Sequence, residues 1–354
     1  MDISALTKES VNLLREMIAI PSPSFEEDAV CSHISSWMTS RNIEHQRIGN
    51  NIIAEHINDP SRPTLMLCAH IDTVSPSPEY SFDPYNPENC PEDMVQGLGS
   101  NDDGASVVSM IAVYRYFCSL SAAQPNLILT LTCEEERSGK DGMTGLWDAR
   151  LRDKVDYAIV GEPTCMKAAT AERGLLVIDA TAHGISGHAA RNEGKNALYI
   201  ALEDIDRLRK HKFSRISPRM GKVNLNVTQI NAGTAHNVIP DCCTFVIDIR
   251  PTEQYTNEEI LQELQAICES ELKPRNLANR SSATREDSPL QKAVGKLGIE
   301  TFSSPTTSDW MRITCDAVKM GPGDSSRSHR KNEFVLIEEI STSIEEYIKF
   351  ISLV

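Results

Sequence analysis

The stretch ILTLTCEEERSG, residues 128–139, sets an apolar run rich in β-branched and leucine residues directly before three adjacent glutamates. A short apolar run of this kind is typical of a buried strand. Glu134, Glu135 and Glu136 repel one another at the end of that strand, so their charge has to be compensated by solvent or by a bound cation. Two interpretations follow from this stretch alone, a solvated acidic turn and a metal site.

The segments around this stretch alternate between strand-like and helix-like patterns. Apolar runs at 64–70, 127–133 and 157–163 predict strands, and residues 104–117 predict a helix. Such alternation indicates an α/β layer with a mainly parallel central sheet. The pattern returns near the C-terminus with AVKMGPG (317–323) and a terminal amphipathic helix over 336–353.

Between these two parts the pattern changes. Strands are predicted at 175–184, 222–230 and 243–250, and helices at 196–211 and 257–272. This β-α-β-β-α order resembles a ferredoxin-like layer. We therefore expect a catalytic domain formed by residues 1–168 and 280–354, with an α+β domain of residues 169–279 inserted into it.

Composition excludes several classes of protein. The 35 basic and 50 acidic residues give a formal charge of -15, which argues against a nucleic-acid partner. The ten cysteines form no C-x-x-C pair, so neither a thiolate zinc site nor a disulfide framework is indicated, and reduced thiols suit a cytoplasmic location. The amphipathic N-terminus lacks the core of a signal peptide, and no run reaches the roughly 20 apolar residues of a membrane span.

Polar residues follow the predicted strands and turns. His70 ends the first strand, and Asp72 can lie on the same face as an orienting partner for the imidazole. Asp102 and Asp103 follow the glycine turn GLGS directly before the predicted helix. The alternatives are a strand-end histidine beside a turn aspartate, and aspartates that act as helix N-caps.

Further candidates lie in the second half of the sheet. Glu135 and Glu136 point in different directions in any regular backbone, so one can bind a metal while the other exchanges a proton. Glu162 follows the strand that begins at residue 157, and His329 lies in the polar loop SSRSHRKNEF, where an ordinary surface histidine is the alternative. Ligands in open α/β sheets bind beyond the carboxyl ends of the strands, so these side chains can meet in one crevice.

Taken together, the candidates form a set of nitrogen and oxygen ligands that zinc accepts, although cobalt or manganese would also fit. The set has two imidazoles and three carboxylates: His70, Asp102, Glu136, Glu162 and His329. If one carboxylate bridges two ions, each ion receives three protein ligands, as in two-metal hydrolytic sites.

The order H-x-D, G-x-G-x-x-D, E-E, G-E-P and a late H-x-x-N-E resembles the dinuclear zinc amidohydrolase family of acetylornithine deacetylase, succinyl-diaminopimelate desuccinylase and carboxypeptidase G. The resemblance covers nearly the whole chain. It implies two zinc ions per subunit, one held by His70, Asp102 and Glu162 and the other by Asp102, Glu136 and His329. Asp102 would bridge the ions, and Glu135 would be the general acid and base.

The sequence departs from the family pattern beside the bridging residue. Asp103 and Gly104 replace the usual basic residue, and Leu98 replaces an arginine. The spacing from Gly99 favours Asp102 as the bridge, and Asp103 is the alternative if the motif is shifted.

The resemblance also implies roles for residues in the inserted domain. In GISGHAA, His188 would reach across a homodimer, formed through this domain, to polarise the scissile carbonyl. Asn237 would contact the substrate and Arg250 would grip its carboxylate, with Arg173 and Thr307 as further pocket residues. The alternatives are a structural histidine and, for Arg250, an ordinary surface ion pair.

The function that follows is hydrolysis of the amide bond of a small N-acyl amino acid. N-acetyl-L-ornithine, in arginine biosynthesis, is the first substrate expected, then N-succinyl-L-ornithine or N-succinyl-diaminopimelate, and then a dipeptide or tripeptide. A non-catalytic dimeric metal-binding relative is the alternative of a different class, and the retained Glu135 argues against it. A nucleotide site at GLGSNDDG is disfavoured, since two acids follow where a phosphate needs donors.

Overall fold

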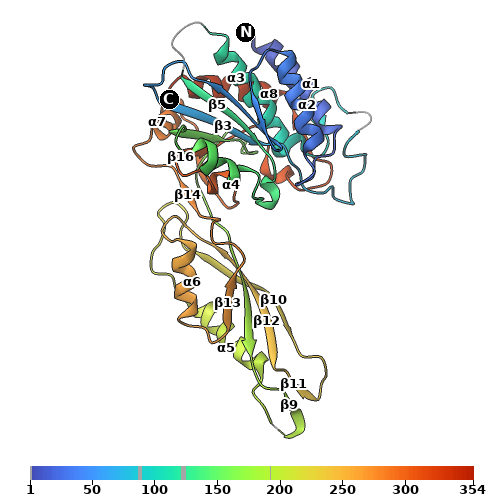
Figure 1. Ribbon diagram of the computed structural model, residues 1–354, viewed down its shortest axis with the longest axis vertical. Coiled ribbons are helices and arrows are strands. Elements are labelled where there is room, and N and C mark those ends of the chain that lie inside the picture. The colour runs from blue at the N-terminus through green and yellow to red at the C-terminus, as the bar shows by residue number, and fades with distance from the viewer. Residues whose placement is uncertain (1, 87–89, 121–124, 192) are drawn as a thin grey trace. The chain divides into compact units, whose positions relative to one another are not determined.

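The computed structural model describes residues 2–86, 90–120, 125–191 and 193–354. The chain divides into two compact units, which Figure 1 shows in the colours of the sequence. Unit 1 comprises Met1–Thr170, Ala283–Phe302 and Ser308–Val354, and unit 2 comprises Ala171–Ser282 and Ser303–Thr307.

The larger sheet has nine strands within the described residues, in the order β1-β2-β5-β3-β6-β16-β7-β14, with β15 beside β7. The strands are β1 Gln46–Ile48, β2 Asn51–His56, β3 Thr64–His70, β5 Asn126–Thr132, β6 Tyr157–Val160, β7 Ala168–Glu172, β14 Ser282–Ala283, β15 Thr301–Ser304 and β16 Asp316–Lys319. The four central strands β5, β3, β6 and β16 run parallel, whereas β2 runs antiparallel to β5 and β7 runs antiparallel to β16. The mixed sheet with a parallel centre confirms the predicted fold class.

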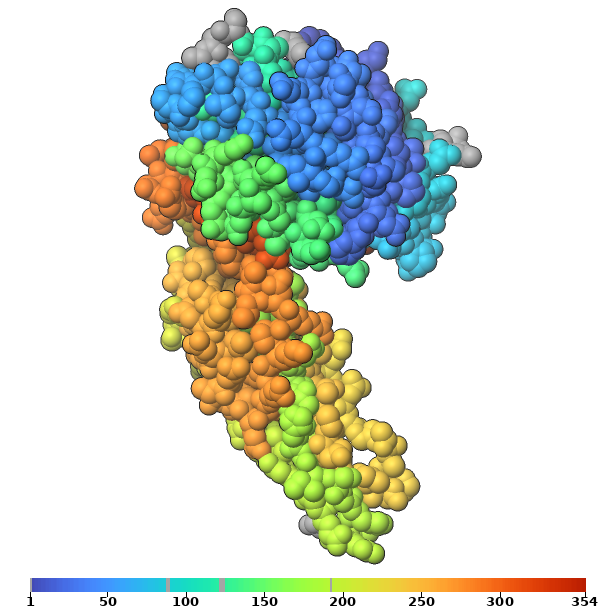
Figure 2. Space-filling view, in the orientation of Figure 1, coloured from blue at the N-terminus to red at the C-terminus, as the bar shows by residue number. Residues whose placement is uncertain are grey.

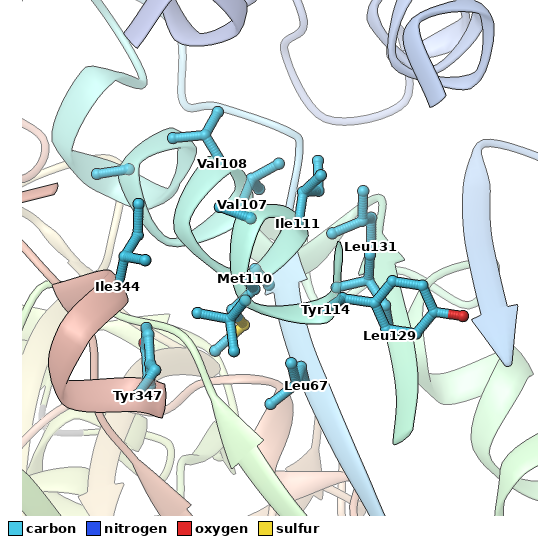
Figure 3. Close-up of a cluster of buried hydrophobic side chains, with 14 of the residues drawn as sticks. Leu67, Val107, Val108, Met110, Ile111, Tyr114, Leu129, Leu131, Ile344 and Tyr347 are labelled. Atoms are coloured by element: carbon cyan, nitrogen blue, oxygen red, sulfur yellow. The ribbon is translucent and has the colours of Figure 1, made fainter. Parts of the chain in front are cut away.

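Helices cover one face of this sheet. They are α1 Ile3–Ile18, α2 Asp28–Ser40, α3 Ala105–Cys118, α7 Pro289–Leu297 and α8 Ile337–Ile351. Because side chains alternate along a strand, Leu65 and Leu67 of β3 belong to the core under these helices, while Met66 and Cys68 belong to a second core with α4 (Met143–Leu146) and Trp310. Figure 3 shows side chains of β3, β5, α3 and α8 meeting in the first core.

The parallel strands fix where the polar residues of the sequence lie. β3 ends at His70, β5 ends two residues before Glu134, and β6 ends two residues before Glu162. β16 ends at Lys319, and the chain after it leads through a short 3₁₀ turn, Ser325–Arg327, to His329. The four carboxyl ends therefore lie at the same edge of the sheet, as the strand-end argument requires.

The glycine turn before α3 has the positive φ angles that its sequence predicts. Gly99 has a φ of 77°, and a β-carbon there would come within 2.6 Å of the Thr73 side chain. An irregular turn, Ser100–Gly104, with non-helical backbone angles at Asp102 and Asp103, leads from it into α3. Nearby, β4 (Met94–Gln96) pairs with β17 (Phe334–Leu336), the strand that directly follows Glu333.

Unit 2 contains an antiparallel sheet in the order β10-β12-β8-β13 and two helices. Its elements are β8 Leu176–His183, β9 Gly187–His188, α5 Ala197–Lys210, β10 Asn224–Ala232, β11 Val238–Ile239, β12 Cys242–Arg250, α6 Asn257–Gln265 and β13 Glu271–Pro274. Every second residue of β8, from Leu176 to Ala182, packs in a separate core with α5, α6 and β12.

One sequence prediction for this unit was wrong. The helix predicted over 257–272 ends at Gln265, and its last residues form the strand β13. The reason is a tertiary contact, because the buried carboxylate of Asp204 accepts the backbone N–H groups of Glu269 and Ser270 at distances from 2.8 to 3.1 Å. These bonds hold the chain in an extended turn before β13, and the order becomes β-α-β-β-α-β.

Among the described residues, no helix combines the length and the apolar character needed to cross a membrane.

In the space-filling view, the blue N-terminal residues form much of the visible surface of unit 1 (Figure 2).

Candidate metal centre

His70 is a buried imidazole with a carboxylate on each side. Its Nε2 lies 3.2 Å from Oδ1 of Asp102, and its Nδ1 lies 3.0 Å from the backbone oxygen of Asp72 and 3.4 Å from the Asp72 carboxylate. Burial lowers the pKa of His70, but the bonds to Asp102 and Asp72 outweigh it and leave the pKa well above its usual value. Asp72 therefore orients the ring so that Nε2 points at Asp102.

Asp102 faces two imidazoles with its two carboxylate oxygens. Oδ1 lies beside His70, and Oδ2 lies 3.6 Å from Nε2 of His329. The same His329 nitrogen is 2.8 Å from Oε1 of Glu136. One carboxylate thus stands between two histidines, as a bridging ligand must.

Asp103 points elsewhere. Its Oδ2 accepts the backbone N–H of His70 at 3.3 Å, and burial raises its pKa to about 7. The helix α3 takes Gly104 as its N-cap, with no side-chain bond at that position. Neither Asp102 nor Asp103 is therefore the N-cap of α3, so the alternative role as N-caps does not apply.

The glutamates after β5 diverge because the backbone turns sharply. Glu134 has a φ of 60°, and Glu135–Arg137 form a 3₁₀ turn. The Asp72 carboxylate accepts the backbone N–H groups of Glu135 at 3.0 Å and Glu136 at 3.2 Å, which fixes this turn beside His70. The Glu136 side chain is only 8% exposed, so the alternative of a solvated acidic turn does not describe it.

The donor atoms form two triads that could each hold a metal ion, namely His70 with Glu135 and Glu162, and His70 with Asp102 and Glu136. Within each triad the donor atoms lie within 4.8 Å of one another. Glu135, predicted as the base, lies as close to His70 and Glu162 as a ligand would. The structure therefore brings all six predicted residues to one edge of the sheet.

The electrostatics of the cluster suit bound cations. Burial raises the pKa of the Glu162 carboxyl well above its usual range, against the opposing charge of Lys319. Burial likewise raises the pKa of Glu135, and repulsion from Glu162 and Glu136 raises it further, while the charge of His70 opposes both effects. Crowded, buried carboxylates and imidazoles are oxygen and nitrogen donors of the kind that divalent metals accept, so these residues fit a dinuclear metal site.

Sequence reasoning missed several residues that support this cluster. Ser24 donates its hydroxyl to Asp72 at 2.7 Å, and Asp309 accepts the hydroxyl of Thr132, the last residue of β5, also at 2.7 Å. Two buried carboxylates, Glu27 and Glu333, hold backbone N–H groups of the loops around the site. Only Glu333 carried a sequence signal, because it closes the H-x-x-N-E motif.

His188 and Asn237 lie side by side in unit 2. His188 in β9 pairs with Val238 in β11, and the N–H of Ala189 bonds to the backbone oxygen of Asn237 at 3.0 Å. Nδ1 of His188 accepts the N–H of Ala190 at 3.1 Å, so the neutral ring carries its proton on Nε2 and can donate from there. Both residues are exposed.

The predicted arginines of unit 2 have protein partners. Arg250 forms a two-pronged bond to Asp248, with distances of 2.9 and 3.1 Å. Arg173 donates to the backbone oxygens of Met220, Lys222 and Arg250.

Thr307 lies partly exposed at the end of the short segment Ser303–Thr307 of unit 2. The catalytic role of His188 stays a prediction. So do the substrate contacts of Asn237, Arg173, Arg250 and Thr307.

Comparisons with known proteins match both parts of the chain. A family model described as peptidase dimerisation domain matches residues 170–276, and one described as peptidase family M28 matches residues 51–162. A succinyl-diaminopimelate desuccinylase of Wolbachia pipientis is 24% identical over 97% of this chain and 92% of its own length. An acetylornithine deacetylase of Proteus mirabilis is 27% identical over 92% of this chain and 91% of its own length.

Solved structures agree on the fold. A dinuclear metal-binding peptidase from the M20 family of Bacillus subtilis superposes with a TM-score of 0.76 at 17% identity, covering 98% of each chain. The matched dimerisation domain, the full-length relatives and the donor set at the carboxyl ends of the parallel strands lead to one assignment. The chain is similar over nearly its whole length to amide-hydrolysing enzymes and contains a match to a peptidase dimerisation domain, and these similarities indicate a metal-dependent hydrolase of the M20 type.

Proposed function

We propose that this protein removes the acyl group from a small N-acyl amino acid by hydrolysing its amide bond. The observation that carries the proposal is the position of Asp102 between His70 and His329, with the carboxyl of Glu135 in the same cluster. A bridging carboxylate with a further carboxylate beside it provides both a site for two cations and a group that can move a proton.

We propose that His70, Asp102 and Glu162 hold one zinc ion and that Asp102, Glu136 and His329 hold the other, with cobalt or manganese as substitutes. When bound, such ions act as Lewis acids that polarise the scissile carbonyl and make water more acidic.

The protein's own residues would supply the proton transfers. Glu135 takes a proton from the attacking water and gives it to the leaving amine nitrogen. Burial and the neighbouring carboxylates Glu162 and Glu136 raise the pKa of its carboxyl in the metal-free protein. Asp72 fixes the position of the His70 ring relative to the Glu135 backbone, because it contacts both. His188 is proposed to donate from Nε2 to the acyl carbonyl.

Two substrates are candidates. The motifs SNDDGASV, CEEERSGKDG and IVGEPT favour N-acetyl-L-ornithine. A specific observation favours the second, N-succinyl-diaminopimelate, because several full-length relatives are succinyl-diaminopimelate desuccinylases, at 24% and 26% identity among others. The pathway, arginine or lysine biosynthesis, follows from which of the two is hydrolysed, and the cytoplasmic location stays a prediction.

The experiment is a parallel assay of the zinc-loaded protein on N-acetylornithine, N-succinylornithine, N-succinyl-diaminopimelate and a simple dipeptide, with detection of the free amine. The Glu135→Gln variant is the matched control, because it should bind the metals without turnover. Activity on an N-acyl amino acid above that control supports the proposal. Activity on the dipeptide alone would make the protein a peptidase, and no activity on all four would support the non-catalytic alternative.

We also propose that residues 169–279 form the domain through which the protein makes a homodimer, inserted into a catalytic domain of 1–168 and 280–354. The dimerisation-domain match supports this assignment. β10 lies at the edge of its sheet among the described strands, and its Ile230 is 43% exposed. An unpaired strand edge with exposed apolar residues favours association. Analytical ultracentrifugation of the wild type and of Ile230→Arg tests it, and a monomeric wild type would contradict it.

A further inference from the structure

Glu333 is a buried carboxylate outside the proposed ligand set. The residue is 2% exposed, and Oε1 of its side chain accepts the backbone N–H groups of both Asn101 and Asp102 at 2.9 Å. Its backbone oxygen accepts the N–H of Gly97 at 3.0 Å. Glu333 therefore holds the turn that carries Asp102 at three points.

Asn101 ties the same turn to the loop that carries His329. Its side-chain oxygen accepts the N–H of Asp324 at 2.9 Å, and its amide donates to the backbone oxygen of Asp324 at 3.1 Å and to Oγ of Ser328 at 3.3 Å. Ser328 directly precedes His329. The two loops are thus bonded to each other at residues adjacent to two proposed ligands that are far apart in the sequence.

We propose that Glu333 is a positioning residue that sets the distance between Asp102 and His329, and through it the affinity for the metal ion that these two residues share with Glu136. The proposal rests on the metal site of the proposed function. Without the Glu333 carboxylate, two buried N–H groups lose their acceptor, and the turn must shift or admit water to satisfy them.

The two metal positions would respond unequally. The ion held by Asp102, Glu136 and His329 draws two of its three ligands from the loops that Glu333 joins. The other ion takes only the bridging Asp102 from these loops. Its other two ligands, His70 at the end of β3 and Glu162 after β6, do not depend on this contact. Residues that orient ligands typically change metal affinity by about 10- to 100-fold, so we expect a loss of that size at one position.

The chain offers a matched control far along the sequence. Asp204 is also fully buried and also accepts two consecutive backbone N–H groups, those of Glu269 and Ser270, but it lies in the core of unit 2. Asp204→Ala should lower stability for the same physical reason as Glu333→Ala and should leave metal binding unchanged.

The experiment titrates the metal-free full-length protein with zinc against a chromophoric chelator and measures two binding constants, together with thermal unfolding. The wild type and Asp204→Ala should bind two ions with the same affinities. Glu333→Ala should lower the affinity for one ion by about tenfold or more and the affinity for the other ion clearly less. Glu333→Gln retains an oxygen acceptor, so it should stay within a few-fold of the wild type. Asn101→Ala removes the side-chain bonds to Asp324 and Ser328, so it should lower the affinity for the same ion. This variant decides the question if Glu333→Ala does not fold.

Each other outcome overturns the inference. Equal loss at both positions, or no loss at either, would make Glu333 a general structural residue. A loss in Glu333→Gln as large as in Glu333→Ala would show that the backbone bonds are not what matters. If the wild type itself fails to bind two ions, the proposed function fails, and that result is distinct from all of these.

Discussion

Replacement of Asp72 by alanine tests the central support of the site. The carboxylate is 1% exposed and accepts three bonds, from the Ser24 hydroxyl at 2.7 Å and from the backbone N–H groups of Glu135 and Glu136 at 3.0 and 3.2 Å. It also lies 3.4 Å from Nδ1 of His70. Alanine removes all four contacts and leaves two partly buried backbone donors without this acceptor.

The magnitude follows from these bonds. Hydrogen bonds to a charged group contribute about 1.5–3 kcal/mol each, so three bonds set an upper range of roughly 4.5–9 kcal/mol. Relaxation of the turn and entry of water recover part of this loss. We expect the free energy of unfolding of metal-free unit 1 to fall by about 3–5 kcal/mol, whereas Asp72→Asn, which keeps one oxygen, should cost roughly 1–2 kcal/mol.

The assay can observe unit 1 by itself. All three tryptophans of the chain, Trp37, Trp147 and Trp310, lie in unit 1. Urea unfolding followed by tryptophan fluorescence, with and without chelator, therefore reports on the unit that contains Asp72. Zinc affinity, measured in parallel, should fall by about 10- to 100-fold in Asp72→Ala. An unfolding free energy within about 1 kcal/mol of the wild type, or unchanged zinc affinity, would refute the reasoning.

Three further predictions follow from the same region. Glu135→Gln should lower kcat by roughly 10²- to 10⁴-fold with metal content intact, and loss of metal by elemental analysis would reassign Glu135 as a ligand. Phe25 is exposed and has a φ of 78°, so Phe25→Gly should raise the free energy of unfolding by about 0.5–1 kcal/mol in urea titrations; a decrease would contradict this. Burial raises the pKa of Asp103 to about 7 and of Glu333 to about 8, and the bond to Glu136 raises that of His329 to about 9. The folded state then binds more protons than the unfolded state, so metal-free protein should lose thermal stability as the pH rises through these values, and a rise would contradict the assignment.

The fold was predictable where local pattern and burial agree. The strand predicted at 64–70 is β3, and the predicted helix 104–117 lies within one residue of α3. The helix predicted over 257–272 failed because the bonds of Asp204 to Glu269 and Ser270 are tertiary, and no pattern in residues 257–272 records them. The short strands β1 and β2 and the helix α2 were not predicted either, since their periodicity is weak.

The proposed ligands were predictable for a different reason. A ligand acts through its side chain, so its chemical type and its place after a strand are visible in the sequence. Glu27 and Glu333 act on backbone N–H groups, and every residue except proline has one. Glu27 accepts the backbone N–H groups of Phe25 and Glu134 at 2.7 and 3.1 Å. The residue types of these two partners therefore give no sign of the contact in the sequence.

The supporting carboxylates explain how so acidic a cluster can be built into a folded chain. The negative charges of the carboxylates would push the loops that carry them apart if only side-chain contacts held these loops. Instead Glu27, Asp72 and Glu333 each accept two backbone N–H groups from these loops, so the main chain is fixed by bonds that do not involve the ligand atoms. The side chains of the proposed ligands would then be available to face bound cations, and metal binding would add to a geometry that the backbone already holds. Removal of a supporting carboxylate should therefore weaken metal binding even though every ligand is still present.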